Sequence, residues 1–397
     1  MLVHWIWFSR LSQVTIGQKL SLLRQFRDPE DICKAEEEAL SQVEGMTAGA
    51  IASLMNKDLT QAQRIITVCI EKNISILTYG DGAYPNKLKN IHNPPLVLYY
   101  KGFLPDWESV PAIAIVGTRK PTADGMQMAY KLGCQIAACG GLVVSGGADG
   151  IDTQALSGAL EAGKRVVAVL GFGADVVYPS KNKALFDSIC RQGCLLTEYA
   201  PGTPPNAWNF PQRNRIISGL CCGVTVVEAP QRSGALNTAT HAADQGRDIF
   251  VVPGNPNNPA CAGSNQLLLQ RALPVFQGWD VMREYESLYP DTVTNVGIVM
   301  PEKLPSKVVS DQCESPQPAK KVIDNREKSR YSVKDTQMPA LSEEEKQVWQ
   351  QLTREPKMVD EVILATHLPA GKVLSILTML AMKGVVTNHP GKRVSLK

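Results

Sequence analysis

The sequence lacks the features of a metal protein, a disulfide-stabilised secreted protein or a membrane protein. Its ten cysteines form no C-x-x-C pair and its five histidines are scattered, so no set of zinc ligands stands out. We expect reduced, mostly buried thiols and no bound metal or cofactor. No stretch approaches the ~20 apolar residues of a membrane span, and the first ten residues have no basic leader. These absences predict a cytoplasmic protein that does not associate with membranes.

The sequence also lacks a strong net charge and the common nucleotide motifs. Lys and Arg number 41 against 38 Asp and Glu, a net charge of +3, so a nucleic-acid binder of this composition would have to gather its positive charge locally. There is no P-loop and no complete G-x-G-x-x-G fingerprint. No Ser/His/Asp or Cys/His set accompanies the loops described below, and the nearest histidine, His241, lies within a predicted helix. The chain is therefore not expected to be an enzyme.

A length of 397 residues suggests two or three domains. Residues 1–78 predict a small helical, SAM-like domain, because apolar residues recur there at helical spacing. Residues 79–282 predict an α/β domain, an extended Rossmann-like fold with a doubly wound parallel sheet. Residues 283–340 are polar and contain prolines, which predicts a linker, and residues 341–397 predict a winged helix of three helices and a hairpin.

The α/β prediction depends on short apolar runs that alternate with amphipathic helices. The runs are rich in Val and Ile and show no polar alternation, as expected of strands that are buried on both faces. They are Ala112–Val116, Leu142–Val144, Val166–Leu170, Cys194–Thr197, Val224–Val227 and Ile249–Val252.

Ligands of a doubly wound sheet bind at the carboxyl ends of its strands, so the residues after each strand are the candidates for a site. After the first run, Gly117, Thr118 and Arg119 offer close backbone approach, a hydroxyl group and a planar guanidinium group for phosphate. After the second, Ser145-Gly146-Gly147 precedes a helix, and its N–H groups could cradle an anion. A tight strand-to-helix turn without a ligand is an equally good interpretation of the second loop.

Later loops add further candidates. Lys181 falls at a helix start on the same edge, and Ser233 and Gly234 can present N–H groups to an anion. Two arginines and an asparagine at the start of a helix could clamp phosphates, and a phenylalanine beside them could stack on a base. The alternative for the arginines is a buried ion pair with Glu198 or Glu228. These four helix residues are Phe210, Arg213, Asn214 and Arg215.

Several anion-binding loops without catalytic groups favour a polymer of phosphates, such as a nucleic-acid strand. The order of the motifs closely resembles that of the DNA-processing protein A (DprA, also called Smf) family over about residues 110–275. Two positions depart from the family: Leu156 stands where His is usual, and Asp244 where Glu is commoner. The matching motifs are Gly117-Thr118-Arg119, Ser145–Asp152, Tyr178-Pro179, Phe210–Gly219, Ser233-Gly234 and Val252-Pro253-Gly254.

The resemblance implies a dimeric Rossmann-like protein that binds and protects single-stranded DNA and helps to load the RecA recombinase during natural transformation. It implies a DNA pocket drawn from Arg119, Gly146, Gly147, Lys181, Arg213 and Arg215.

Two other functions are considered. A phosphoribohydrolase of the LOG type has a similar layout, but Ala235 and Thr238 stand where its motif has Thr and Glu. A transcription factor acting through helix Ala370–Lys383 is disfavoured, because the middle of that helix is apolar. A protein contact, or an auxiliary DNA contact through Lys392 and Arg393, fits the C-terminal domain better.

Overall fold

The computed structural model describes residues 1–297 and, in the C-terminal part, residues 343–353, 355, 357–366, 368–369, 372–373, 375–377, 380, 386–389 and 393–396. Contacts between residues divide the chain into two compact units, Met1–Ser310 and Asp311–Lys397, which are described separately. Most of the expected linker lies outside the described residues.

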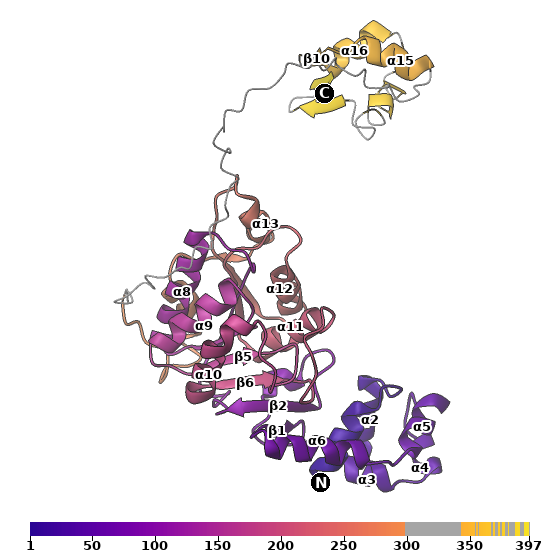
Figure 1. The fold of residues 1–397 in the computed structure, drawn as a ribbon, viewed down its shortest axis with the longest axis vertical. Coiled ribbons are helices and arrows are strands. Elements are labelled where there is room, and N and C mark those ends of the chain that lie inside the picture. The colour runs from indigo at the N-terminus through magenta and orange to yellow at the C-terminus, as the bar shows by residue number, and fades with distance from the viewer. Residues whose placement is uncertain are drawn as a thin grey trace, which may run out of the picture. The chain divides into compact units, whose positions relative to one another are not determined.

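The first unit begins with six short helices (Figure 1). The Thr15 hydroxyl accepts a hydrogen bond from the Gln18 N–H, and Asp28 caps the helix that begins at Pro29, so each start has its own signal. The helices pack around Ile6, Phe8 and other buried apolar side chains. Their bounds are α1 Leu2–Arg10, α2 Ile16–Phe26, α3 Pro29–Lys34, α4 Glu37–Ser41, α5 Ala48–Met55 and α6 Thr60–Glu71.

The predicted helical region is too long by one element, because Ser75–Thr78 is a strand. It joins a nine-stranded sheet with the order β1-β2-β6-β5-β4-β3-β7-β8-β9. The strands from β6 to β9 in this order are parallel, whereas β2 is antiparallel to both β1 and β6. The bounds are β1 Ser75–Thr78, β2 Val97–Gly102, β3 Ala112–Val116, β4 Leu142–Ser145, β5 Val166–Val169, β6 Cys194–Thr197, β7 Gly223–Val226, β8 Asp248–Val251 and β9 Leu273–Pro274.

All six predicted strands are confirmed, with shifts of one residue at some ends. β1, β2 and β9 were not predicted. The Val-Leu-Tyr-Tyr run of β2 is a strand signal, but it stands outside the alternation of strands and helices on which the prediction relied.

Helices cover both faces of the sheet (Figure 1). One buried cluster lies between the sheet and α8, α9 and α10, and a second lies between the sheet and α11 and α12. The doubly wound architecture is therefore confirmed. The bounds are α7 Asn86–Lys89, α8 Ala123–Ala138, α9 Ile151–Glu161, α10 Lys183–Gln192, α11 Asn209–Leu220, α12 Gly234–Asp244, α13 Ala262–Leu269 and α14 Gly278–Met282.

The start of the expected linker, residues 283–297, packs on the sheet domain instead. The buried Tyr285 hydroxyl donates to the Asp248 carboxylate at 2.7 Å, and Val293 is part of the core. The prediction was wrong here because polar composition, averaged over a window, hides a few well-spaced apolar side chains.

The second unit contains α15 Glu343–Gln350, α16 Val359–Thr366 and a small antiparallel sheet of order β10-β12-β11. Both predicted strands are confirmed, as β11 Val386–His389 and β12 Arg393–Leu396, and β10 Lys357–Met358 was not predicted. The core of the second unit includes four residues of the expected third helix, Val373, Ile376, Leu377 and Leu380. Among the described residues of both units, no helix combines the length and apolar character needed to cross a membrane.

Candidate functional site

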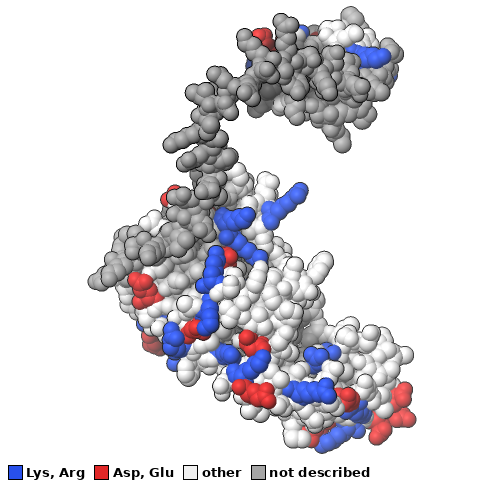
Figure 2. Space-filling view, in the orientation of Figure 1, with Lys and Arg blue, Asp and Glu red and all other residues white. Residues whose placement is uncertain are grey.

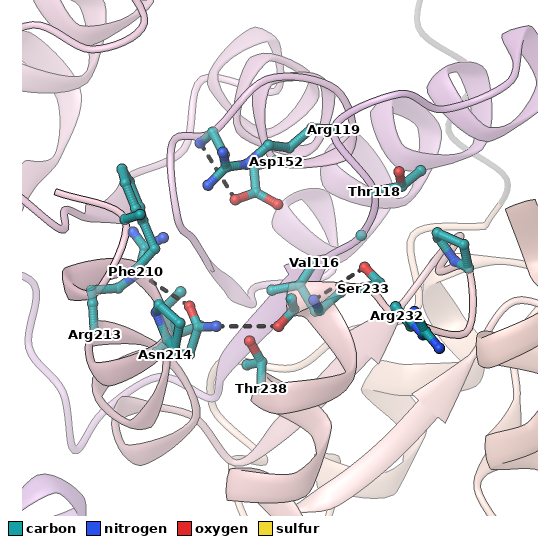
Figure 3. Close-up of a pocket in the computed structure, with 18 of the residues that line it drawn as sticks. Val116, Thr118, Arg119, Asp152, Phe210, Arg213, Asn214, Arg232, Ser233 and Thr238 are labelled. Carbon is teal, nitrogen blue, oxygen red and sulfur yellow. Dashed lines mark hydrogen bonds between the residues drawn. The ribbon is translucent and has the colours of Figure 1, made fainter. Parts of the chain in front are cut away.

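A cavity of about 580 Å³ opens at the carboxyl ends of β3 and β7, beside the amino-terminal ends of α11 and α12 (Figure 3). The parallel strands deliver their following loops to this one edge of the sheet. Eight of the residues predicted from sequence line it: Gly117, Thr118, Arg119, Phe210, Arg213, Asn214, Ser233 and Gly234. Gly146 and Gly147 line a smaller adjoining hollow, which shares Arg119, Tyr178 and Phe210 with the cavity.

Arg119 is the predicted cation that the structure leaves most available. Its side chain is exposed, and its guanidinium carbon lies 4.9 Å from the centroid of the Phe210 ring. Phe210 is braced in turn by Tyr178, with ring centroids 6.0 Å apart. Within the described residues, no carboxylate lies in ion-pair distance of Arg119. The ring therefore holds a guanidinium group whose hydrogen-bond donors remain open to an anion.

The backbone around Gly117 and Thr118 fixes the position of Arg119. The Thr118 N–H donates to the Glu228 carbonyl at 2.7 Å, and the Ile151 N–H donates to the Thr118 carbonyl at 3.3 Å. A Cβ at Gly117 would lie 2.5 Å from Ile151 Cγ1, so only glycine fits. The Glu228 carboxylate accepts from the N–H and the hydroxyl of Thr122, and so it does not pair with an arginine of α11.

The glycine-rich loop after β4 is occupied by a side chain of the protein. Asp152 Oδ2 accepts from the N–H groups of Gly146 (3.1 Å) and Ala148 (3.4 Å), so these donors already hold an anion. Ser145 is fully buried and its hydroxyl donates to the Ile115 carbonyl, which removes it from the site. The expectation that Ser145 and the Gly146 N–H contact a ligand is thus corrected.

Burial raises the pKa of Asp152 to about 6, and this effect outweighs the nearby Arg213 and the two backbone donors, which lower it. Gly147, at φ +65°, turns the loop so that its carbonyl accepts from the Asn182 amide at 3.1 Å.

Arg213 lines the cavity, but it is buried and its donors hold the loops together. It is only 3% exposed, and its Nη1 donates to the carbonyls of Gly146 and Val169. Its Nε donates to Asn214 Oδ1 at 3.2 Å. Burial lowers the pKa of Arg213 to about 10, so the guanidinium group still carries its charge near neutral pH. It supplies a fixed positive charge beneath the cavity and beside Asp152.

Arg215 faces away from the cavity, and its placement in the predicted pocket is corrected. Its Nη2 lies 2.5 Å from Glu198 Oε2, and both side chains are mostly buried. This is the ion pair considered above as the alternative. Lys181 also stands apart from the cavity: its Nζ lies 3.1 Å from Asp149 Oδ1 on the exposed surface.

The start of α12 forms the opposite wall of the cavity. Ser233 Oγ accepts from the Ala235 N–H at 3.2 Å and caps the helix, whose positive end faces the cavity. The Asn214 amide ties this start to α11, since it donates to the Gly234 carbonyl and to Asn237 Oδ1.

Two residues that the sequence analysis did not select complete the site. Arg232 is exposed and lines the cavity just before the Ser233 cap, and Tyr178 lines it with 42% of its surface exposed. Tyr178 belonged to a quoted motif and Arg232 directly preceded another, so their position in the loops after the strands was the signal that could have found them. Among the described residues, no cluster of His, Cys, Asp or Glu could hold a metal ion.

Comparison with known proteins identifies the family. Residues 75–286, more than half of the chain, match the family described as DNA recombination-mediator protein A, and residues 333–392 match the DprA winged helix domain. The chain belongs to the DprA/Smf family.

Its relatives cover most of this DprA-family chain. Protein Smf of Synechocystis is 32% identical over 98% of this chain and 97% of its own. The DNA processing protein DprA of Bacillus subtilis is 37% identical over 60% of this chain and 80% of its own. Among solved structures, DprA of Streptococcus pneumoniae superposes with a TM-score of 0.63 at 33% identity, covering 72% of this chain and 98% of that one. The extent of the first family match, from β1 to the residues after α14, coincides with the sheet and the helices that cover it.

Proposed function

We propose that this protein binds single-stranded DNA along the cavity edge without chemical catalysis. The observation that carries the proposal is the exposed Arg119 guanidinium group, which is stacked on Phe210 and unpaired with any described carboxylate, in an open cavity that also contains Arg232 and the start of α12. Arg119 and Arg232 would neutralise phosphates, and the Gly234 N–H would hold a single oxygen, because the Ser233 N–H already donates to a carbonyl of its own loop.

Aromatic side chains favour a single strand over a duplex. Tyr178 and Phe210 lie at the cavity, and Tyr178 keeps much of its ring exposed. Unpaired bases can stack on such rings whatever their sequence, whereas the bases of a duplex are already stacked on one another. Arg213, Asn214 and Asp152 would position the loops, and Arg215 would not contact DNA.

The test is a titration of fluorescent poly-dT with the full chain at several salt concentrations. We expect Arg119→Ala and Arg232→Ala each to weaken binding about tenfold and to reduce the salt slope by about 0.7 for each phosphate that is no longer neutralised. Arg165→Ala is the matched control, because Arg165 is exposed and directly precedes β5, at the opposite end of the strands. Equal affinity of the Arg119 and Arg165 variants would rule out the assignment.

The sequence of a LOG-type phosphoribohydrolase places a glutamate where this chain has Thr238. Thr238 lines the cavity and is 1% exposed, so a hydroxyl group stands where that enzyme needs a carboxylate. Incubation with AMP separates the two functions. Release of adenine would support the enzyme, and its absence together with binding of poly-dT would support the present proposal.

We further propose a cytoplasmic role in natural transformation, in which the protein protects incoming strands and helps to load RecA. Membership in a family described as a recombination mediator supports this role.

We also propose a homodimer, which would present two cavities and gain avidity on long strands. The dimer is supported by a cluster of exposed apolar side chains at the edge of the sheet. They are Leu269 of α13, Leu273 of β9 and Phe276. We expect Leu269→Lys to halve the mass measured by light scattering if this group forms the interface.

A further inference from the structure

A second cavity, of about 240 Å³, lies between the N-terminal helices and the antiparallel side of the sheet. Arg10 and Lys19 line it from the helices, and Tyr99 of β2 lines it from the sheet. The Arg215–Glu198 pair forms another part of its wall. None of these residues lines the cavity proposed for DNA.

Lys19 is the unusual group in this cavity. It is 7% exposed, and its Nζ donates to the Ser9 carbonyl at 2.9 Å and lies 6.0 Å from the centroid of the Phe8 ring. Among the described residues, no carboxylate lies within ion-pair distance of this ammonium group. Burial alone lowers the pKa of Lys19 to about 8. A buried cation without a counter-ion is costly, and an ammonium group has three donors, so the site is suited to an anion.

The other ionisable groups of the wall leave the cavity positive. Arg215 and Glu198 cancel each other, and Arg10 is exposed, with its Nη2 donating to the Gln61 amide oxygen at 3.1 Å. Arg215 Nη1 and Glu198 Oε1 are buried and have no hydrogen-bond partner among the described residues. A ligand that has both acceptor oxygens and a hydroxyl group could accept from Arg215 Nη1 and donate to Glu198 Oε1 after a small movement of these side chains.

We propose that this cavity binds a phosphate group, with Lys19 as the direct contact and Arg10 as a second cation. A phosphate dianion matches the two positive charges left over after the Arg215–Glu198 pair, and its several oxygens can accept from donors on different sides of the cavity. Bound there, it bridges the helical region and the sheet and stabilises their contact. The proposal does not depend on DNA binding in the first cavity.

The experiment measures thermal unfolding of the full chain with inorganic phosphate, with sodium chloride adjusted to keep the ionic strength constant. We expect phosphate to raise the unfolding midpoint of the unmodified protein and of Arg119→Ala by the same few degrees. We expect Lys19→Met to show at least a tenfold weaker apparent affinity for phosphate, because methionine keeps the packing but not the charge. Lack of a phosphate shift in the unmodified protein, or a full shift in Lys19→Met, would overturn the proposal.

A second measurement needs no variant. Amine labelling of the unmodified protein, continued until the buried Lys19 is modified in the absence of phosphate and followed by mass spectrometry, should show slower labelling of Lys19 with phosphate, whereas the exposed Lys34 is labelled equally with and without it. Equal labelling of Lys19 in both conditions would contradict the site. Comparison of 5′-phosphorylated with unphosphorylated oligo-dT then identifies the source of the phosphate. A preference for the phosphorylated oligomer that Lys19→Met abolishes assigns the site to a strand end, and protection by inorganic phosphate alone assigns it to the free ion.

Discussion

At the residue scale, Asp152 and Arg213 form the electrostatic centre of the loops at the proposed DNA-binding edge. Asp152 holds the two N–H groups of the glycine-rich loop, and Arg213 holds the carbonyls of the same loop and of β5. A glycine-rich turn of this kind usually offers its N–H groups to a ligand. Here an internal carboxylate uses them, which leaves side chains such as Arg119 to make the external contacts.

The pKa of Asp152 makes stability depend on pH. It is about 6 in the folded protein and 3.8 as the ordinary value, so the folded state takes up a proton before the unfolded state as pH falls. Ionised Asp152 therefore costs stability above pH 6, and the cost is relieved as pH falls from 6 toward 4. Asp152→Asn cannot titrate. We expect the unmodified protein to gain about 1 kcal/mol relative to this variant between about pH 7 and about pH 5, measured by urea unfolding. Parallel stability curves would contradict this.

Arg215 provides a test of whether it has a structural role only, unlike the arginines proposed to contact DNA. Arg215→Ala leaves Glu198 buried without its partner, and we expect a loss of about 3 kcal/mol in the free energy of unfolding. The affinity of the folded fraction for poly-dT should stay within about twofold of the unmodified value. Glu198→Gln is the companion variant and should also destabilise without changing DNA affinity. A variant of Arg215 that keeps its stability but binds DNA tenfold more weakly would reverse the assignment.

At the element scale, α8 and α9 approach closely enough to bring backbone against backbone. A Cβ at Gly133 would collide with the Ala155 carbonyl, and one at Gly158 with the Tyr130 carbonyl. This contact sets the position of α9, whose first turn carries Asp152 into the glycine-rich loop. The packing of two helices thus controls the shape of the ligand edge.

Substitution at the helix contact should therefore be costly. We expect Gly158→Ala to lower the free energy of unfolding by about 2 kcal/mol, because the helices must separate. Gly49→Ala in α5 is the control, since no atom lies within 4 Å of the added Cβ, and it should be neutral or stabilise by up to about 1 kcal/mol. Urea unfolding of both variants is the measurement, and equal effects would contradict the close-packing argument.

At the scale of the whole molecule, the positive and negative charges nearly balance, with 41 Lys and Arg against 38 Asp and Glu. On the face shown in Figure 2, Lys and Arg side chains run down the first unit with Asp and Glu among them. A net charge of +3 is compatible with the proposed DNA binding, because two exposed arginines, Arg119 and Arg232, and the positive end of α12 lie at the cavity.

All residues that line the proposed DNA cavity lie in the first unit. We therefore expect a chain of residues 1–297 to bind short oligo-dT within about twofold of the full chain, measured by fluorescence anisotropy. The winged helix would contribute little to this contact. A tenfold or greater drop in affinity on truncation would mean that the second unit takes part in binding.

The sequence by itself determined the six central strands, because runs of Val and Ile without polar alternation suit only strands covered on both faces. It also determined that the loops meet, because parallel strands carry their carboxyl ends to one edge. Tertiary structure decided which side chains are free at that edge. Arg213 and Arg215 are two positions apart on α11, about 200° around a helix, so they face opposite sides and cannot both contact one DNA strand. Whether the N–H groups of the glycine loop met a ligand or Asp152 depended on how closely α9 packs, and only the folded arrangement of α8 and α9 sets that distance.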